Sequence, residues 1–135
     1  MGKKKVVMCA SASLEKEILS WKQKLEEDFD LIKYPEKLTG DFLPGYEKEF
    51  TDHYKSIIQT DILFILNVEK KGIPGYIGPG VFAEIGFAVG LNRSLDKNIE
   101  IICLNHIPDS LAYSEELKFW ETLGWIKFRD EDNSF

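Results

Sequence analysis

The sequence predicts an α/β fold: a doubly wound, flavodoxin- or Rossmann-like parallel sheet of about five strands with helices on both faces. Three observations lead to this prediction. The chain has 135 residues, which suits one domain over residues 1–135. Strand-like and helix-like segments alternate along it. The central strand-like segments are continuous apolar runs, which are typical of parallel strands covered on both faces.

Local composition and spacing predict each element in turn. Short runs rich in Val and Ile predict strands, and apolar residues at helical spacing predict helices. The predicted strands are Lys4–Ala10, Phe29–Tyr34, Asp61–Asn67, Ile99–Leu104 and Trp125–Phe128. The predicted helices are Glu15–Glu27, Tyr46–Gln59, Phe82–Leu91 and Tyr113–Thr122. Right-handed crossovers between these strands favour the order 2-1-3-4-5.

Two connections receive specific predictions. Gly40, Pro44 and Gly45 are helix breakers, so Lys37–Gly45 is predicted to be a loop. Ser11 and Ser13 precede the first helix, and either hydroxyl could cap it.

Composition and charge exclude several classes of function. The net charge of −6 argues against binding to nucleic-acid polymers or to anionic membranes. No apolar run reaches the roughly 18 to 20 residues of a membrane span, and the start MGKKKVV lacks the apolar segment of a signal peptide. Cys9 and Cys103 lie in apolar segments, which predicts buried thiols rather than a disulfide or a metal site. His53 and His106 show no metal-ligand spacing. We therefore expect a cytoplasmic protein without a metal or a cofactor.

The fold predicts where a ligand would bind. Doubly wound sheets bind ligands at the carboxyl ends of their strands, near the switch point between the first and third strands. The loops there are Ala10–Ser13, Asn67–Gly80 and Asn105–Ser110. Ser11 and Ser13 could hold an anion at the helix start, or could only cap that helix. The second loop is rich in glycine, which leaves room for a ligand but also suits a flexible connection. It matches neither a Walker A loop nor the dinucleotide fingerprint.

Glu84 is the most informative residue of the sequence. It lies about one turn into the apolar helix, among Phe82, Ile85 and Phe87. Burying a carboxylate costs free energy unless it is paired, and proteins accept that cost most often at functional sites. The alternative is a glutamate at the solvent edge of the first turn, stabilised by the helix dipole.

Three segments resemble the nucleoside 2-deoxyribosyltransferase superfamily, which includes the 2′-deoxynucleoside 5′-phosphate N-hydrolases. They are Asp61–Asn67 (DILFILN), Gly75–Gly78 (GYIG) and Ala83–Ala88 (AEIGFA). Gly78–Glu84 is also similar to the GxGTxxE element of the nucleotide phosphoribohydrolases once called lysine decarboxylase-like, with Val81 in place of threonine. Both families cleave N-glycosidic bonds. The resemblance implies a flavodoxin-like fold, a catalytic Glu84, and a homodimer or higher homo-oligomer.

The resemblance also suggests roles for individual residues. Cleaving the bond builds positive charge on C1′ of the sugar, which Glu84 could attack or stabilise. The transferases carry an aspartate where this chain has His53, with Asp52 beside it. Either residue could protonate the leaving base or orient the sugar, although His53 could equally be an exposed helix residue. The expected substrate-binding residues are Ser11, Ser13, Asn67, Gly75, Tyr76, Gly78 and Gly80.

We therefore expect an enzyme that acts on a nucleoside or a nucleoside 5′-monophosphate, by hydrolysis or base exchange. One alternative is a non-catalytic nucleotide-binding or sensing module of the same fold, and another is a small interaction protein whose loops bind another chain. The histidine in place of the aspartate favours the binding module over a standard transferase. Glu84 within its frame of small residues favours an enzyme.

Overall fold

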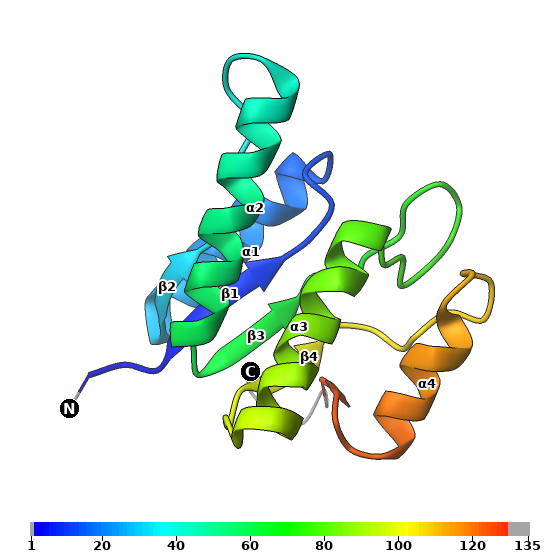
Figure 1. The fold of residues 1–135 in the computed structure, drawn as a ribbon. Helices are drawn as coiled ribbons and strands as arrows, with labels where there is room; N and C mark the ends of the chain where they lie inside the picture. Colours follow the sequence, from blue (N-terminus) through cyan, green and yellow to red (C-terminus); the bar gives the residue numbers. More distant parts are fainter. Residues whose placement is uncertain (1, 130–135) are drawn as a thin grey trace.

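Strands and helices alternate along the chain in the computed structural model, which describes residues 2–129 (Figure 1). The strands are β1 (Lys5–Cys9), β2 (Asp30–Lys33), β3 (Ile62–Ile65), β4 (Glu100–Cys103) and β5 (Lys127–Phe128). The helices are α1 (Glu15–Asp28), α2 (Phe42–Gln59), α3 (Pro79–Leu95) and α4 (Ser114–Thr122). Each predicted strand and helix is present, with its ends shifted by a few residues.

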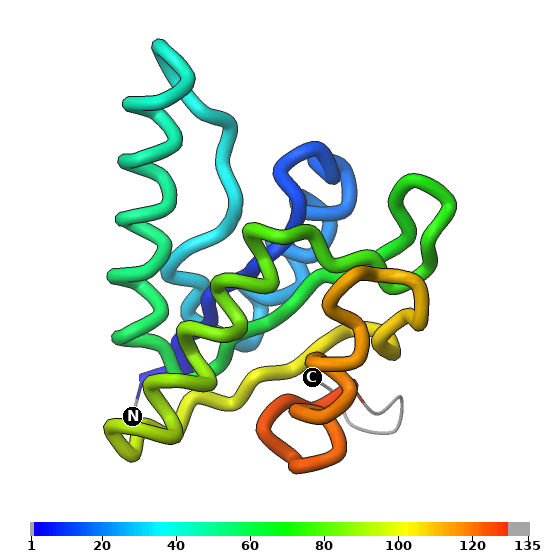
Figure 2. The backbone as a smooth tube through the Cα atoms, turned by 45° about the vertical axis from the view of Figure 1, so that its right-hand side comes forward, coloured from blue at the N-terminus to red at the C-terminus, as the bar shows by residue number. Residues whose placement is uncertain are grey.

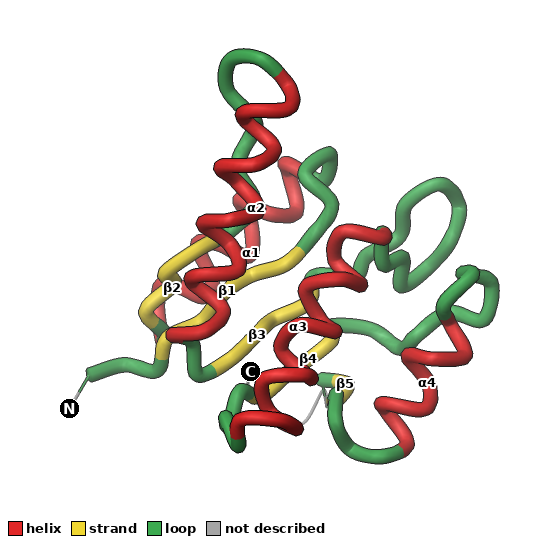
Figure 3. Tube along the Cα trace, in the orientation of Figure 1, coloured by secondary structure: helices red, strands yellow, loops and turns green. Residues whose placement is uncertain are grey.

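The strands form one parallel sheet in the order β2-β1-β3-β4-β5 (Figure 3). This confirms the predicted fold class and strand order. Val6–Cys9 of β1 pairs in register with Ile62–Ile65 of β3, and these residues are all buried. The switch point therefore lies between β1 and β3, at the centre of the sheet.

The two faces of the sheet are covered by different helices. Side chains alternate between the faces along each strand, so neighbouring residues enter different cores. One core joins α1 to the sheet through Ile18, Leu25, Val6, Met8 and Phe64. The other joins α2, α3 and α4 to the sheet through Ile57, Ile85, Leu117, Val7, Cys9 and Leu63. Within residues 2–129, no helix has both the length and the apolar character to cross a membrane.

The predicted helix starts were partly wrong. α2 begins at Phe42. Most of the predicted loop Lys37–Gly45 lies before this helix, but Pro44 and Gly45 lie inside its first turn. Proline is tolerated there because the first N–H groups of a helix have no partner within the helix. α3 begins at Pro79 rather than Phe82 for the same reason.

The predicted serine cap of the first helix was also wrong. The residue at the N-cap of α1 is Leu14, and no side chain caps this helix end. Ser11 and Ser13 lie before it, with their hydroxyl oxygens 3.2 Å apart.

The first half of α2 extends beyond the end of the sheet (Figure 2). Its aromatic side chains form a ladder, with ring centroids 5.8 Å apart for Phe42–Tyr46 and 4.4 Å apart for Tyr46–Phe50. The outer end of this ladder is exposed: Phe42 at 65% and Tyr46 at 44%, with Leu43 beside them at 71%.

Candidate functional site

A cavity of about 380 Å³ opens between α2 and α3 at the carboxyl ends of β1, β2 and β3. The predicted loops after β1 and β3 both line it, which agrees with the predicted location. The loop after β2, through Pro35, Glu36 and Leu38, forms a further wall. The third predicted loop, Asn105–Ser110, instead lines a separate cavity. The first cavity is large enough to hold a small organic ligand.

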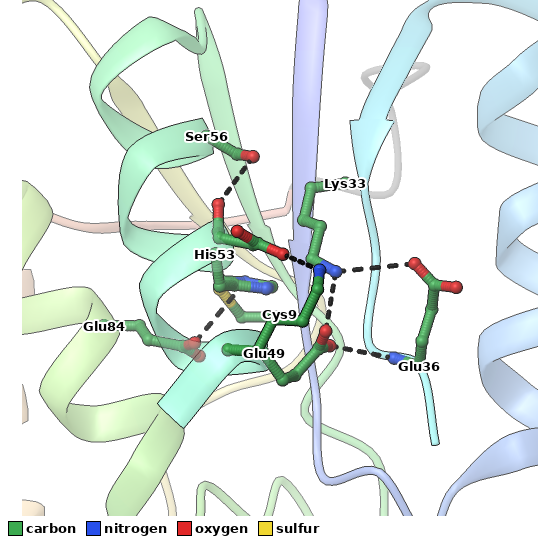
Figure 4. Close-up of polar contacts among 9 residues, drawn as sticks. Cys9, Lys33, Glu36, Glu49, His53, Ser56 and Glu84 are labelled. Carbon is green, nitrogen blue, oxygen red and sulfur yellow. Dashed lines mark hydrogen bonds and ion pairs between the residues drawn. The ribbon is translucent and has the colours of Figure 1, made fainter. Parts of the chain in front are cut away.

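Three buried side chains from three elements meet here, and two of them, His53 and Glu84, line the cavity (Figure 4). They are Glu84 of α3, His53 of α2 and Cys9 at the end of β1, and their exposed fractions are 6%, 3% and 0%. Nε2 of His53 lies 3.5 Å from Oε2 of Glu84 and 3.3 Å from Sγ of Cys9. Two of the alternatives are therefore wrong: Glu84 is not at the solvent edge, and His53 is not an exposed helix residue.

Helical spacing explains how these side chains are aimed. His53 and Ile57 lie one turn apart on α2, and both are buried on the side that faces the sheet. Glu84, Ile85 and Ala88 share the buried side of α3. The apolar residues around them pack into the sheet, so the carboxylate and the imidazole are held at the end of β1.

Burial controls the ionisation of this cluster. It raises the pKa of Glu84 to about 7, because a carboxylate loses hydration among apolar neighbours. It lowers the pKa of His53 to about 4, and the positive charge of Lys33 adds to this effect. Burial, followed by the negative charge of Glu84, holds the pKa of Cys9 well above its ordinary value. At neutral pH these directions favour an uncharged imidazole and an uncharged thiol beside Glu84.

A group of paired charged side chains lies beside His53 (Figure 4). The Lys33 ammonium donates to Glu49 Oε1 at 2.8 Å and to Glu36 Oε1 at 3.4 Å. The other oxygen of Glu49 accepts the Glu36 backbone N–H at 3.1 Å. Glu49 lies one turn before His53 on α2, so the same face of the helix supplies both residues.

Positive charge lies at the mouth of the cavity. Lys70 donates a hydrogen bond to the Ser11 hydroxyl and thereby joins the loops after β3 and β1. The ammonium groups of Lys70 and Lys71 lie 5.5 and 5.9 Å from the ring centre of Tyr76. Ser11, Tyr76 and both lysines line the cavity, as do Gly78 and Gly80 at the start of α3.

Other predicted site residues lie elsewhere. The Asn67 amide donates to the carbonyls of Gly75 (3.3 Å) and Asn105 (2.9 Å), and its Oδ1 accepts the Asn105 N–H at 3.0 Å. Asp52 pairs with Lys48 at 2.7 Å. Neither of these side chains lines the cavity, and neither do Ser13 and Gly75.

Asp61 has a structural contact, and its carboxylate accepts the Lys5 N–H at 2.8 Å. Cys9 and Cys103 are buried free thiols, as predicted.

Sequence reasoning missed the part that Cys9 and Glu49 take in the site. Cys9 carried one usable signal, because it is the last residue of the first strand and lies at the ligand-binding end of the sheet. Glu49 carried another, since it lies four residues before His53 on one helix. The contact of Lys70 with Ser11 could not be predicted locally, because it spans 59 residues of sequence.

No protein-family model matches the chain, and no curated protein is significantly similar to it. The resemblance to the nucleoside 2-deoxyribosyltransferase superfamily therefore stays a prediction. The geometry itself offers a buried carboxylate beside an imidazole, in a cavity with cations at its mouth. Such a site suits reactions that develop positive charge next to the carboxylate, on a substrate that carries negative charge at its other end.

Proposed function

We propose that this protein cleaves the N-glycosidic bond of a nucleoside or nucleoside 5′-monophosphate, by hydrolysis or base exchange. The observation that carries the proposal is Glu84: a carboxylate 6% exposed, in the wall of a cavity at the switch point of the sheet. Its burial strengthens electrostatic effects on a bound sugar. The resemblance of Ala83–Ala88 to the catalytic segment of the transferase superfamily gives the same assignment.

The proposed reaction has two steps. In the first, the electron pair of the C1′–N bond leaves with the base, and the positive charge that develops on C1′ is stabilised or captured by the Glu84 carboxylate. The departing base takes up a proton from solvent, which makes its departure easier, and a water that attacks in the second step returns a proton to solvent. In the second step, water or a second base attacks C1′ and releases Glu84 as the carboxylate.

His53 acts on Glu84 rather than on the substrate in this proposal. Its Nε2 lies 3.5 Å from the Glu84 carboxylate, so it can fix the position of the attacking oxygen. We therefore assign His53 as a positioning residue. Asp52, which pairs with Lys48 away from the cavity, has no role in the proposed machinery.

The cavity favours a 5′-monophosphate over an uncharged nucleoside. A hydroxyl from Ser11 and ammonium groups from Lys70 and Lys71 lie at the mouth. The start of α3 also lines the cavity, through Gly78 and Gly80. Free N–H groups at a helix start bind anions. Phe50 and Tyr76 offer aromatic faces for the base or the sugar.

The test is base release by the full chain. The protein is incubated in EDTA with a panel of ribo- and deoxyribonucleosides and their 5′-monophosphates, and free base is followed by chromatography. We expect release from at least one monophosphate, faster than from the matching nucleoside. Glu84→Gln should reduce turnover by at least ~10³-fold without unfolding the protein, because the neutral amide fills the same space but cannot attack C1′. Full turnover by Glu84→Gln would exclude the nucleophile role.

A non-catalytic nucleotide-binding module is the second candidate. It is favoured by His53, which replaces the acidic residue of the transferases and is held uncharged by burial. In that case no base is released from any compound of the panel, while a monophosphate still raises the melting temperature of the protein. Adding a second base distinguishes the two remaining enzyme reactions, because only base exchange forms a new nucleoside.

Two broader predictions accompany this function. We propose a homodimer or higher homo-oligomer that associates through the exposed apolar end of α2, where Phe42, Leu43 and Tyr46 lie next to the cavity residue Phe50. We also propose a cytoplasmic location, where nucleotides are substrates and the free thiols Cys9 and Cys103 stay reduced.

A further inference from the structure

We propose that Cys9, His53 and Glu84 form a binding site for a thiophilic divalent cation of the zinc class. Each residue offers one ligand atom, and the three atoms lie within 4.8 Å of one another. They come from β1, α2 and α3, so the fold brings together residues that are far apart in the sequence. The side chains are buried, which fixes their positions before a cation arrives.

Two of the three distances between ligand atoms match tetrahedral coordination, and the third, between Cys9 Sγ and the Glu84 carboxylate, is at most 4.8 Å. Zinc binds sulfur at about 2.3 Å, and nitrogen and oxygen at about 2.0–2.2 Å, so tetrahedral ligand atoms lie roughly 3.4–3.6 Å apart. Sγ of Cys9 and Nε2 of His53 are 3.3 Å apart, and Nε2 of His53 and Oε2 of Glu84 are 3.5 Å apart. Small side-chain adjustments would bring all three atoms onto one ion.

The charges also balance. A thiolate and a carboxylate carry two negative charges, which neutralise a divalent cation in a buried place where an unpaired charge is costly. His53 binds a cation as the neutral imidazole, so it completes the set without adding charge. The cation displaces the proton of the Cys9 thiol as it binds. Sulfur and nitrogen ligands favour zinc over magnesium and calcium, which prefer sites made of oxygen atoms.

Because the three ligands include the proposed nucleophile, a bound cation would affect the proposed reaction. Both His53 and Glu84 line the cavity, so the fourth ligand position faces the cavity and its solvent. A cation bound to Glu84 withholds the carboxylate from C1′, and zinc is then an inhibitor of the proposed reaction. This inhibitory consequence rests on the proposed function, whereas the binding site itself does not.

Cobalt titration tests the site directly. The full chain is stripped with a chelator and titrated with Co²⁺, which gives a thiolate-to-cobalt charge-transfer band in the near ultraviolet when a cysteine binds it. We expect the band to saturate at one ion per chain and to disappear when Zn²⁺ is added. The absence of this band at saturating Co²⁺ in the wild-type protein would overturn the proposal.

The two cysteines give a matched pair of variants. Cys9→Ser should abolish the band and weaken zinc binding by about a hundredfold or more, because removing a ligand costs more than removing an outer contact. Cys103→Ser should keep the band, since Cys103 is an equally buried free thiol outside the set. Circular dichroism checks that both variants are folded. An undiminished band in folded Cys9→Ser would show that the cation binds elsewhere, against the proposal.

The inhibitory step has its own readout. Base release is measured with EDTA and again with saturating Zn²⁺, after binding has been established by the cobalt band. We expect zinc to suppress release and EDTA to restore it. Release that continues at saturating zinc contradicts inhibition. If no base is released under either condition while the cobalt band forms, the proposed function fails and the metal site stands.

Discussion

Two glycines in the loop between β3 and α3 have similar positive φ angles but different surroundings. Gly72 and Gly75 have φ angles of +77° and +73°, in the left-handed region that glycine tolerates best. A Cβ on Gly72 would meet nothing within 4 Å, whereas a Cβ on Gly75 would lie 2.5 Å from the carbonyl oxygen of His106. Gly75, which the sequence suggested as a substrate contact, therefore allows the loops after β3 and β4 to pack closely.

This pair yields a prediction about stability. Gly72→Ala should lower the free energy of unfolding by about 1 kcal/mol, the cost of a left-handed alanine. Gly75→Ala carries the same cost and a collision with backbone, so we expect a loss of about 3 kcal/mol or more. Equilibrium unfolding in urea measures both values. Equal losses in the two variants would show that the loop moves aside and that the close approach is unimportant.

Some residues of the site can be recognised from the sequence and others cannot. Glu84 is detectable because a carboxylate interrupts an apolar helix, and that contrast is local. His53 and Cys9 are not detectable as a pair, because their 3.3 Å contact joins residues 44 positions apart. Asn67 was misassigned for a related reason: its side chain was expected to face a ligand, but the loop after β4 uses its amide.

At the scale of elements, Asn67 connects the ends of β3 and β4. Its buried amide and the Asn105 amide exchange hydrogen bonds with each other's backbone, at distances of 2.9 to 3.0 Å. It also holds the Gly75 carbonyl. The start of the loop that leads to α3 is fixed in this way, although Asn67 itself does not line the cavity.

Removing this connection should destabilise the protein. Asn67→Ala removes the hydrogen bonds to the buried Gly75 carbonyl and to the partly buried backbone of Asn105, which costs about 1–3 kcal/mol of unfolding free energy. Asn98→Ala, at an exposed position before β4, should change it by less than about 0.5 kcal/mol. Thermal and urea unfolding provide the comparison. A stable Asn67→Ala protein that has lost substrate binding would restore the original assignment of Asn67 as a ligand contact.

Sheet elements were more predictable than helix starts, for physical reasons. β1 and β3 are covered on both faces, so their apolar runs carry the signal of a central parallel strand in the sequence itself. The start of α2 was misjudged because proline and glycine break helices only beyond the first turn. The extra turn matters, since it carries the exposed Phe42 and Leu43 at the outer end of α2.

At the scale of the whole molecule, α2 and α3 differ in how much apolar surface they leave exposed for self-association. Much of the apolar surface of α3 is covered within the chain, since Phe82 stacks on Tyr113 at 4.5 Å and Phe87 contacts Tyr54 at 5.1 Å. α3 therefore offers little exposed apolar surface to the homo-oligomer that the resemblance implies. At the exposed end of α2, by contrast, residues 2–129 leave Leu43 71% exposed.

Leu43→Lys should therefore weaken the proposed homodimer. Burying a leucine at an interface contributes about 1.5–3 kcal/mol, so replacing it with a charge should raise the dissociation constant by about tenfold or more. Leu95→Lys is the matched control, because Leu95 is 66% exposed at the far end of α3. Sedimentation velocity over a range of concentrations measures both variants against the wild-type protein. If the wild-type chain sediments as a monomer throughout, or if both variants dissociate equally, the end of α2 is not the interface.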